Sequence, residues 1–347
     1  MTFEITIKDS EHSFDCAADE TVLAAAMRAD LMLPYGCRNG ACGTCKGKVL
    51  AGDVDYGPHQ AATLTDDEKR AGLVLFCCAK PKSNLEIEVR EVRRVGDLQV
   101  KRLPCRIESI DKAAPDVAIV RFKLPANERL QYLPGQYVDF LLKDGKRRSF
   151  SLATPPHDDK LLELHIRHVP GGLFTDALFN EYKGREILRL EGPLGSFYLR
   201  EDTDRPIVFV AGGTGFAPIK AMIEHALHHE LPREMVLYWG ARSLPDLYLP
   251  DLPGTWQAAH RNFTFIPVLS EPRPEDRWQG RTGLVHQAVM ADFPDLSGYV
   301  VYACGAPAMI DAARRDFGAC CRLPADQFHA DSFTYAAAEG QTLDGAA

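Results

Sequence analysis

The spacing of hydrophobic and polar positions changes character twice along the chain. Between residues 1 and 90, alternating segments such as FEITI, KGKVL and LEIEV predict strands, and TVLAAAMRAD predicts a short helix. From 103 to 202, short strand-like segments are separated by Gly and Pro, which is typical of an antiparallel barrel. From 205 onward, apolar strands alternate with helical segments, which predicts a parallel sheet with crossover helices.

These changes predict three domains, because 347 residues exceed the size of most single hydrophobic cores. The segment REVRRVGDLQVKR lacks apolar periodicity, which predicts a linker. Within the first domain, TDDE at 65–68 fits a helix-capping box and predicts the start of a short helix. The expected divisions are a first domain at 1–90, a linker at 91–102, a barrel at 103–202, a parallel-sheet domain at 203–335 and a tail at 336–347.

Composition narrows the class of protein. Hydrophobic residues make up 46% and charged residues 25%, as in folded globular proteins. A net charge of −8 argues against a nucleic-acid ligand, which requires clustered basic residues. The longest apolar stretch, at 206–219, is shorter than the roughly 20 residues of a membrane span, and the N-terminus does not resemble a signal peptide. We therefore expect a cytoplasmic protein without a membrane span.

The ten cysteines include one run with metal-ligand spacing. Cys37, Cys42 and Cys45 form C-x4-C-x2-C, and Cys77 and Cys78 follow some thirty residues later. This spacing is the plant-type arrangement for a [2Fe–2S] cluster. A zinc site is the alternative, but zinc ligands usually come as two short pairs.

The residues around these cysteines fit the same chemistry. Gly36, Gly40 and Gly43 would let the loop curl so that backbone N–H groups face the sulfur atoms. Four further cysteines have no ligand-like partner and are expected to be core or surface thiols: Cys16, Cys105, Cys320 and Cys321.

The segment CCAKPKSNLEIEV resembles the end of the plant-type ferredoxin motif. In that family the last ligand lies four residues before a proline. The resemblance therefore implies that Cys77, four residues before Pro81, is the fourth ligand and that Cys78 packs as a small apolar side chain.

The remainder of the chain carries several ordered motifs: RRSFSLAT, PGQYV, PGGLFTDAL, GPLGSF, AGGTGFAPI and YACGAPAMI. In this order they resemble the ferredoxin–NADP reductase superfamily over residues 103–332. The implied fold class is multidomain α+β and α/β, with a β-grasp ferredoxin domain, an antiparallel β-barrel flavin domain and a parallel-sheet nicotinamide-nucleotide domain.

The resemblance implies a flavin site on the barrel. Arg148 would bind the FAD pyrophosphate, Phe150 would lie against the isoalloxazine and Ser151 would hydrogen-bond near its reactive N5. Phe150 stands where the family most often has tyrosine. A second phosphate-binding stretch would comprise Arg167, Gly171, Gly172 and Thr175. Solvated strand edges are the alternative for the two arginines, and core packing is the alternative for Phe150.

The turn after the strand PIVFVAGG suits a dinucleotide, because helix N-terminal N–H groups can hold a pyrophosphate. It departs from G-x-G-x-x-G, since Pro218 occupies the place of the third glycine. The family resemblance implies nicotinamide contacts at Gly212, Gly213, Thr214, Gly215, Cys304 and Gly305. Simple packing is the alternative for Cys304.

Coenzyme choice depends on Glu271. It stands where NADPH-using relatives have a basic residue, and a carboxylate repels a 2′-phosphate, so NADH is favoured. Arg242 and Arg273 nearby weigh against this. Phe333 and Tyr335 are candidates for the aromatic ring that covers the flavin, with packing as the alternative for both.

No histidine pattern indicates a metal site or a hydrolase: H-E-x-x-H and G-x-S-x-G are both absent, and His228 and His229 are expected at an exposed helix end.

Together these domains predict a reductase. NADH gives up electrons in pairs and an iron–sulfur cluster accepts one at a time, so a flavin belongs between them. The domain order resembles reductase components of methane and phenol monooxygenases, of benzoate-type dioxygenases, and most strongly the CDP-6-deoxy-Δ3,4-glucoseen reductases. The implied partner is an electron-acceptor protein, either a dehydrase or an oxygenase component. The alternatives are a redox-sensing flavin and iron–sulfur module and an interaction protein with structural zinc.

Overall fold

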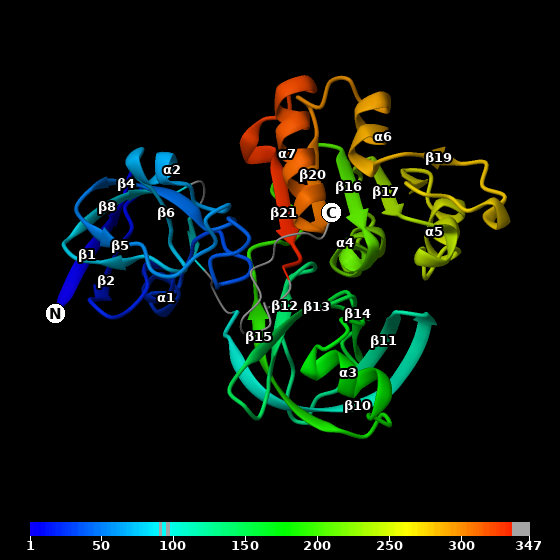
Figure 1. The fold of residues 1–347 in the computed structure, drawn as a ribbon, viewed down its shortest axis with the longest axis horizontal. Helices are drawn as coiled ribbons and strands as arrows, with labels where there is room; N and C mark the ends of the chain where they lie inside the picture. Colours follow the sequence, from blue (N-terminus) through cyan, green and yellow to red (C-terminus); the bar gives the residue numbers. More distant parts are fainter. Residues whose placement is uncertain (90–91, 95–97, 335–347) are drawn as a thin grey trace.

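The computed structural model describes residues 1–89, 92–94 and 98–334. The predicted tail at 336–347 and Tyr335 lie outside the described residues. Three regions are visible in Figure 1, one in blue, one in cyan to green and one that runs from green through yellow to red. The predicted fold class is confirmed by their sheets: a mixed small sheet, an antiparallel barrel and a parallel sheet.

The first domain is a five-stranded mixed sheet in the order β2-β1-β8-β4-β6, in which β1 and β8 run parallel. Thr21 caps α1, and Thr65 with Glu68 forms the predicted capping box of α2. The sheet strands are β1 (Thr2–Ile7), β2 (Ser13–Ala17), β4 (Lys46–Ala51), β6 (Leu73–Leu75) and β8 (Leu85–Glu88), and the helices are α1 (Val22–Arg28) and α2 (Asp66–Arg70).

Two small ladders complete this domain. β5 (Val54–Asp55) pairs with β7 (Lys80–Pro81), and β3 (Leu31–Met32) pairs with β9 (Arg93–Arg94). β9 lies within the segment that we expected to be a plain linker, and the following strand already begins at Lys101. The linker is therefore anchored to the first domain by backbone pairing.

The barrel has six antiparallel strands in the order β13-β12-β15-β10-β11-β14. A bridge between Leu152 and Leu164 joins its two edges and closes it. Its elements are β10 (Lys101–Ala114), β11 (Val117–Lys123), β12 (Tyr137–Leu141), β13 (Arg147–Ser151), β14 (Leu162–Arg167), α3 (Leu173–Asn180) and β15 (Ile187–Leu194).

The parallel-sheet domain has six strands in the order β19-β18-β17-β16-β20-β21. Side chains of β16 alternate between two apolar clusters, one formed with α4 and α5 and the other with α6 and α7. Its elements are β16 (Ile207–Gly212), α4 (Phe216–His228), β17 (Met235–Ala241), α5 (Leu252–Ala259), β18 (Phe263–Leu269), β19 (Arg281–Thr282), α6 (Val285–Asp292), β20 (Val300–Gly305), α7 (Pro307–Cys320) and β21 (Phe328–Ser332).

The described residues contain no helix that is both long and apolar enough to cross a bilayer.

Candidate functional site

The cysteine loop, residues 36–45, turns its backbone towards sulfur. The amides of Ala41 and Cys42 lie 3.4 and 3.3 Å from Cys37 Sγ, and the Cys37 amide lies 3.3 Å from Cys42 Sγ. The loop curls through Gly40 and Gly43, both with positive φ. A Cβ on Gly40 would lie 2.9 Å from Cys78 Sγ. The loop therefore presents the N–H groups that the sequence predicted.

The thiols of this region influence one another's protonation. The interaction with Cys42 lowers the pKa of Cys37 to about 6, and the interactions with Cys45 and Cys78 lower the pKa of Cys77 to about 3. The pKa of Cys45 is raised by its interaction with Cys77 and by burial. All ten cysteines are free thiols, so none is consumed by a disulfide. Closely spaced thiols with backbone N–H groups turned towards them are the donor set that an iron–sulfur cluster uses, and the site fits one.

Cys78 is buried and its Sγ lies 3.5 Å from Cys77 Sγ. Cys16, Cys105 and Cys321 are buried far from this loop in sequence, and Cys320 is exposed.

A central cavity of about 240 Å³ lies where the three domains meet. The barrel contributes the predicted flavin residues Arg148, Phe150 and Ser151. The cysteine loop contributes Gly36 and Cys37. The parallel-sheet domain contributes residues from the start of α4 and the end of β21: Thr214, Ala217, Asp331, Ser332 and Phe333.

The phosphate-binding features predicted for the barrel converge on this cavity. Arg167 ends β14, and its Nε and Nη2 are buried without a hydrogen-bond partner among the described residues, although Nε lies 3.4 Å from the Asp116 carboxylate. Gly172 and Thr175 begin α3 and also line the cavity. A guanidinium with unused hydrogen-bond donors beside a helix N-terminus suits a diphosphate, so the cavity fits a flavin dinucleotide. Gly171 has a positive φ of 79° and precedes this helix start.

The glycine turn after β16 is packed too closely for side chains. A Cβ on Gly215 would lie 2.1 Å from the Cys304 carbonyl oxygen, and one on Gly212 would lie 2.7 Å from Met309 Sδ. Trp239 Nε1 donates a hydrogen bond of 3.0 Å to the Gly213 carbonyl. Only glycine therefore fits at these positions of the turn, which lies at the carboxyl end of the parallel sheet, where such folds bind nucleotides.

The other nucleotide candidates occupy different environments. Cys304 is fully buried in β20 and does not line the central cavity, whereas Gly305 accepts a hydrogen bond of 2.9 Å from the Phe333 amide. Glu271 is exposed just after β18, and its amide donates to the Arg242 carbonyl. Arg273 is exposed beside it.

Asp331, near the end of β21, was not predicted from the sequence as a site residue. It is 9% exposed and lines the central cavity together with Ser151. Burial, reinforced by Cys42, raises the pKa of its carboxyl to about 7. The available signal in FHADSFTYA was a single carboxylate two residues before the candidate aromatic ring Phe333.

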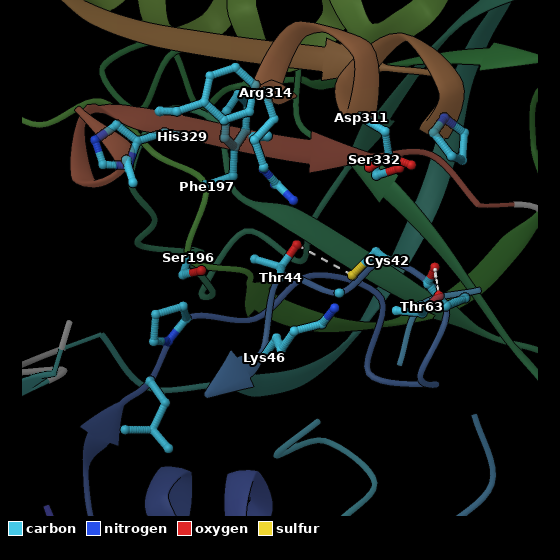
Figure 2. A pocket seen from close by; sticks show the side chains of 18 of the residues that line it. Cys42, Thr44, Lys46, Thr63, Ser196, Phe197, Asp311, Arg314, His329 and Ser332 are labelled. Carbon is cyan, nitrogen blue, oxygen red and sulfur yellow. Dashed lines mark hydrogen bonds between the residues drawn. The ribbon is translucent and has the colours of Figure 1, made fainter. Parts of the chain in front are cut away.

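A lateral cleft of about 680 Å³ opens on the other side of the cysteine loop. In Figure 2, Arg314 and Asp311 of α7 face Cys42, Thr44 and Lys46 across it. Thr44 Oγ1 lies 3.3 Å from Cys42 Sγ. The cysteine loop thus borders the central cavity with Cys37 and the lateral cleft with Cys42.

These features define an electron-transfer reductase that combines an iron–sulfur centre, a flavin site and a nicotinamide-nucleotide domain. Comparison with known families agrees, matching residues 5–82 to the 2Fe-2S iron-sulfur cluster binding domain, 104–198 to the oxidoreductase FAD-binding domain and 209–315 to the oxidoreductase NAD-binding domain. The chain belongs to the ferredoxin-reductase family of iron–sulfur flavoproteins.

The names of individual relatives place them with different partner enzymes. The chain is 40% identical over 317 residues to the CDP-6-deoxy-L-threo-D-glycero-4-hexulose-3-dehydrase reductase of Yersinia pseudotuberculosis, covering 91% of this chain and 94% of the relative. It is 36% identical over 338 residues to reductase component 2 of a Comamonas terephthalate 1,2-dioxygenase, covering 96% and 98%. The crystal structure of an Amycolatopsis cytochrome P450 reductase superposes with a TM-score of 0.79 at 34% identity, covering 96% and 99%.

Proposed function

We propose that this reductase takes electrons from NADH and delivers them, through FAD and a [2Fe–2S] cluster, to the dehydrase of CDP-3,6-dideoxyhexose synthesis. The observation that carries the proposal is the central cavity, which the barrel, the cysteine loop and the parallel-sheet domain line together. Bound FAD would supply the exchange between a two-electron donor and a one-electron acceptor. The chain's own contribution is to hold these groups in one place.

On the barrel we assign the flavin to residues that already line the cavity. Arg148 and Arg167 provide positive charge for the diphosphate, and Phe150 offers an aromatic surface packed against Phe140 and Phe174. Ser151 offers a hydroxyl in the cavity, and Phe333, directly after β21, lines it and is the ring that we assign to cover the flavin. Gly171, Gly172 and Thr175 present the start of α3.

For the cluster we propose Cys37, Cys42, Cys45 and Cys77 as ligands. The pKa of Cys77 is lowered by its interaction with Cys45, which links this thiol to the cysteine loop. A matched pair of variants separates the two adjacent thiols. We expect Cys77→Ser to abolish the visible absorption of the cluster while NADH still reduces the flavin, and Cys78→Ser to retain both. If only Cys78→Ser loses the cluster, Cys78 and not Cys77 is the fourth ligand.

For the coenzyme we propose binding at Gly212, Gly213, Thr214, Gly215 and Gly305, with Cys304 behind the turn near the site of hydride exchange. Glu271 would favour NADH by repelling a 2′-phosphate. We expect Glu271→Gln to reduce the ratio of kcat/KM for NADH over NADPH about tenfold. The assay uses flavin reduction with each coenzyme, and an unchanged ratio removes Glu271 from coenzyme selection.

For the acceptor we propose approach through the lateral cleft, because this cleft gives access to the Cys42 side of the cysteine loop from outside. The dehydrase is favoured by the 40% identity over nearly the whole length of a dehydrase reductase. The all-free cysteines also fit a reducing compartment such as the cytoplasm.

The deciding experiment supplies NADH and compares two purified acceptors, the dehydrase and a terephthalate-type oxygenase component, with ferricyanide as a control for the flavin. Dehydrase-dependent turnover at least tenfold above that with the oxygenase component supports the proposal. Preference for the oxygenase would establish the second candidate, a dioxygenase reductase, which the 36% identity over 96% of this chain favours. Reduction of neither protein, with ferricyanide reduction intact, would contradict both.

A further inference from the structure

Four histidines gather where the barrel meets the parallel-sheet domain. His225 and His228 lie in the last turn of α4, His229 is its C-cap, and His157 lies on the barrel between β13 and β14. The His157 ring stacks on His228 with centroids 3.7 Å apart, and the His225 and His229 rings are 4.3 Å apart. His157 is separated from the others by almost seventy positions, so only the domain interface brings them together.

Three of these rings have the spacing of metal ligands. One ligating nitrogen from each of His157, His225 and His229 lies within 4.8 Å of the others. His225, in the last turn of α4, and His229, its C-cap, are four residues apart, which brings their rings together. Zinc–nitrogen bonds of about 2.1 Å place tetrahedral ligand atoms about 3.4 Å apart, so small side-chain rotations would close the group around an ion.

His225 is already oriented as a ligand. Its Nε2 lies 3.0 Å from Glu201 Oε1, and its Nδ1 is buried without a hydrogen-bond partner among the described residues. If Nε2–H donates to the carboxylate, the lone pair on Nδ1 is left for an ion. A carboxylate behind a histidine is the arrangement that fixes the tautomer and orientation of metal-bound imidazole.

The environment also favours neutral rings, the form that binds metal. Burial, with the neighbouring histidines, lowers the pKa of His157. Burial lowers the pKa of His225 as well, although Glu201 opposes the shift. Asp158 is the other charged group that faces His157.

We propose that His157, His225 and His229 form a binding site for one Zn²⁺ ion that joins the barrel to the parallel-sheet domain. Three imidazoles suit a divalent transition metal better than Mg²⁺ or Ca²⁺, which prefer oxygen. Water completes the coordination. None of the three residues lines the central cavity, so the ion acts as a clamp between domains and takes no part in electron transfer.

The test uses the untagged holoprotein, with its cluster and flavin intact, in isothermal titration with ZnCl₂. We expect one saturable equivalent, and binding weakened at least a hundredfold in His225→Ala and in His157→Ala. Glu201→Gln should weaken binding about tenfold, because the orienting carboxylate is lost. His12→Ala, in the first domain between β1 and β2, is the control and should bind like the wild type.

Copper provides an independent readout. The electron paramagnetic resonance spectrum of one equivalent of Cu²⁺, added to the oxidised holoprotein, should show nitrogen coupling that disappears in His225→Ala. Sulfur ligation would instead indicate a cysteine site and overturn the proposal. Absence of saturable zinc binding by the wild type, or unchanged affinity in both His157→Ala and His225→Ala, would also overturn it. Flavin content and cluster absorption confirm that each variant is folded.

Discussion

The barrel contacts its two neighbours in different ways. Towards the parallel-sheet domain, Val117, Phe197 and Leu199 belong to the same apolar cluster as β16 and α4. Towards the first domain, no such continuity exists among the described residues, because the apolar core of that domain contains only its own residues, from Ile5 to Ile87, with packed neighbours up to Val92.

Polar contacts instead join the first domain to the barrel. Tyr137 donates a hydrogen bond of 2.7 Å to the Gly36 carbonyl, and Tyr35 and Ser196 exchange hydrogen bonds through their backbone and side chain. Arg38 lies 3.7 Å from each of two barrel carboxylates, Asp139 and Glu191.

The apolar interface and the polar interface of the barrel suit hydride transfer and electron transfer, respectively. Hydride transfer needs reacting atoms held about 3–3.5 Å apart, and a shared apolar core provides that rigidity. An interface of hydrogen bonds and partly exposed ion pairs is weaker and can open. We therefore expect the first domain to separate from the barrel more easily than the parallel-sheet domain does.

We expect the largest effect on the free energy of unfolding from a substitution of Glu163, which lies on the barrel side of the interface with the parallel-sheet domain. Its carboxylate lies 2.7 Å from Arg121 and 3.0 Å from His165, both of the barrel, and 3.4 Å from Lys220 of α4. Burial opposes ionisation, but these partners together lower the pKa of Glu163 from 4.5 to about 2. The resulting stability is present above about pH 4.5 and is lost as the pH falls towards 2.

We expect Glu163→Gln to lower the free energy of unfolding of the barrel and parallel-sheet domain by about 3 kcal/mol at neutral pH. The variant should also lose less stability than the wild type on acidification. Calorimetry measures the free energy of unfolding and its dependence on pH, and flavin fluorescence reports separately on the domains that hold the flavin. Glu128→Gln is the control, because Glu128 forms an exposed pair of 3.5 Å with Lys101. Equal destabilisation by the two variants would contradict a special role of the interface.

A smaller effect is expected at Tyr137, in the polar interface. Tyr137→Phe removes the bond to Gly36 and should weaken docking of the first domain by about 1 kcal/mol. The linker should then be cleaved several-fold faster by a limiting amount of protease. Tyr132→Phe removes a comparable bond of 3.0 Å to the Thr154 carbonyl inside the barrel and should leave linker cleavage unchanged. Similar cleavage in both variants would show that docking does not depend on the Gly36 contact.

The smallest effect is expected at Arg38. Because its charge pairs are long, Arg38→Gln should weaken docking by less than about 1 kcal/mol. The wild type should lose the same amount at high salt, and the variant should lose almost nothing there. The rate of linker proteolysis at low and high salt measures the strength of docking. If docking of Arg38→Gln still weakens at high salt, the salt dependence comes from other charges.

Local signals in the sequence predicted the three sheets and the cysteine loop, since strand periodicity and ligand spacing are properties of neighbouring residues. Contacts between distant segments could not be read in this way. The Tyr137–Gly36 bond spans 101 positions. His157 joins α4 only through the domain interface, although His228 and His229 lie at the exposed helix end that the sequence predicts. The pairing of β9 with β3 was missed because two arginines carry no strand pattern.

That pairing sets the length of the tether on the first domain. Seven peptide steps separate Arg94, the end of β9, from Lys101, the start of β10. Fully extended, they reach about 24 Å. A linker this short keeps the undocked first domain at an effective concentration in the millimolar range near its docking surface on the barrel. Contacts that would be too weak to hold two separate proteins together are then enough for the domain to dock again.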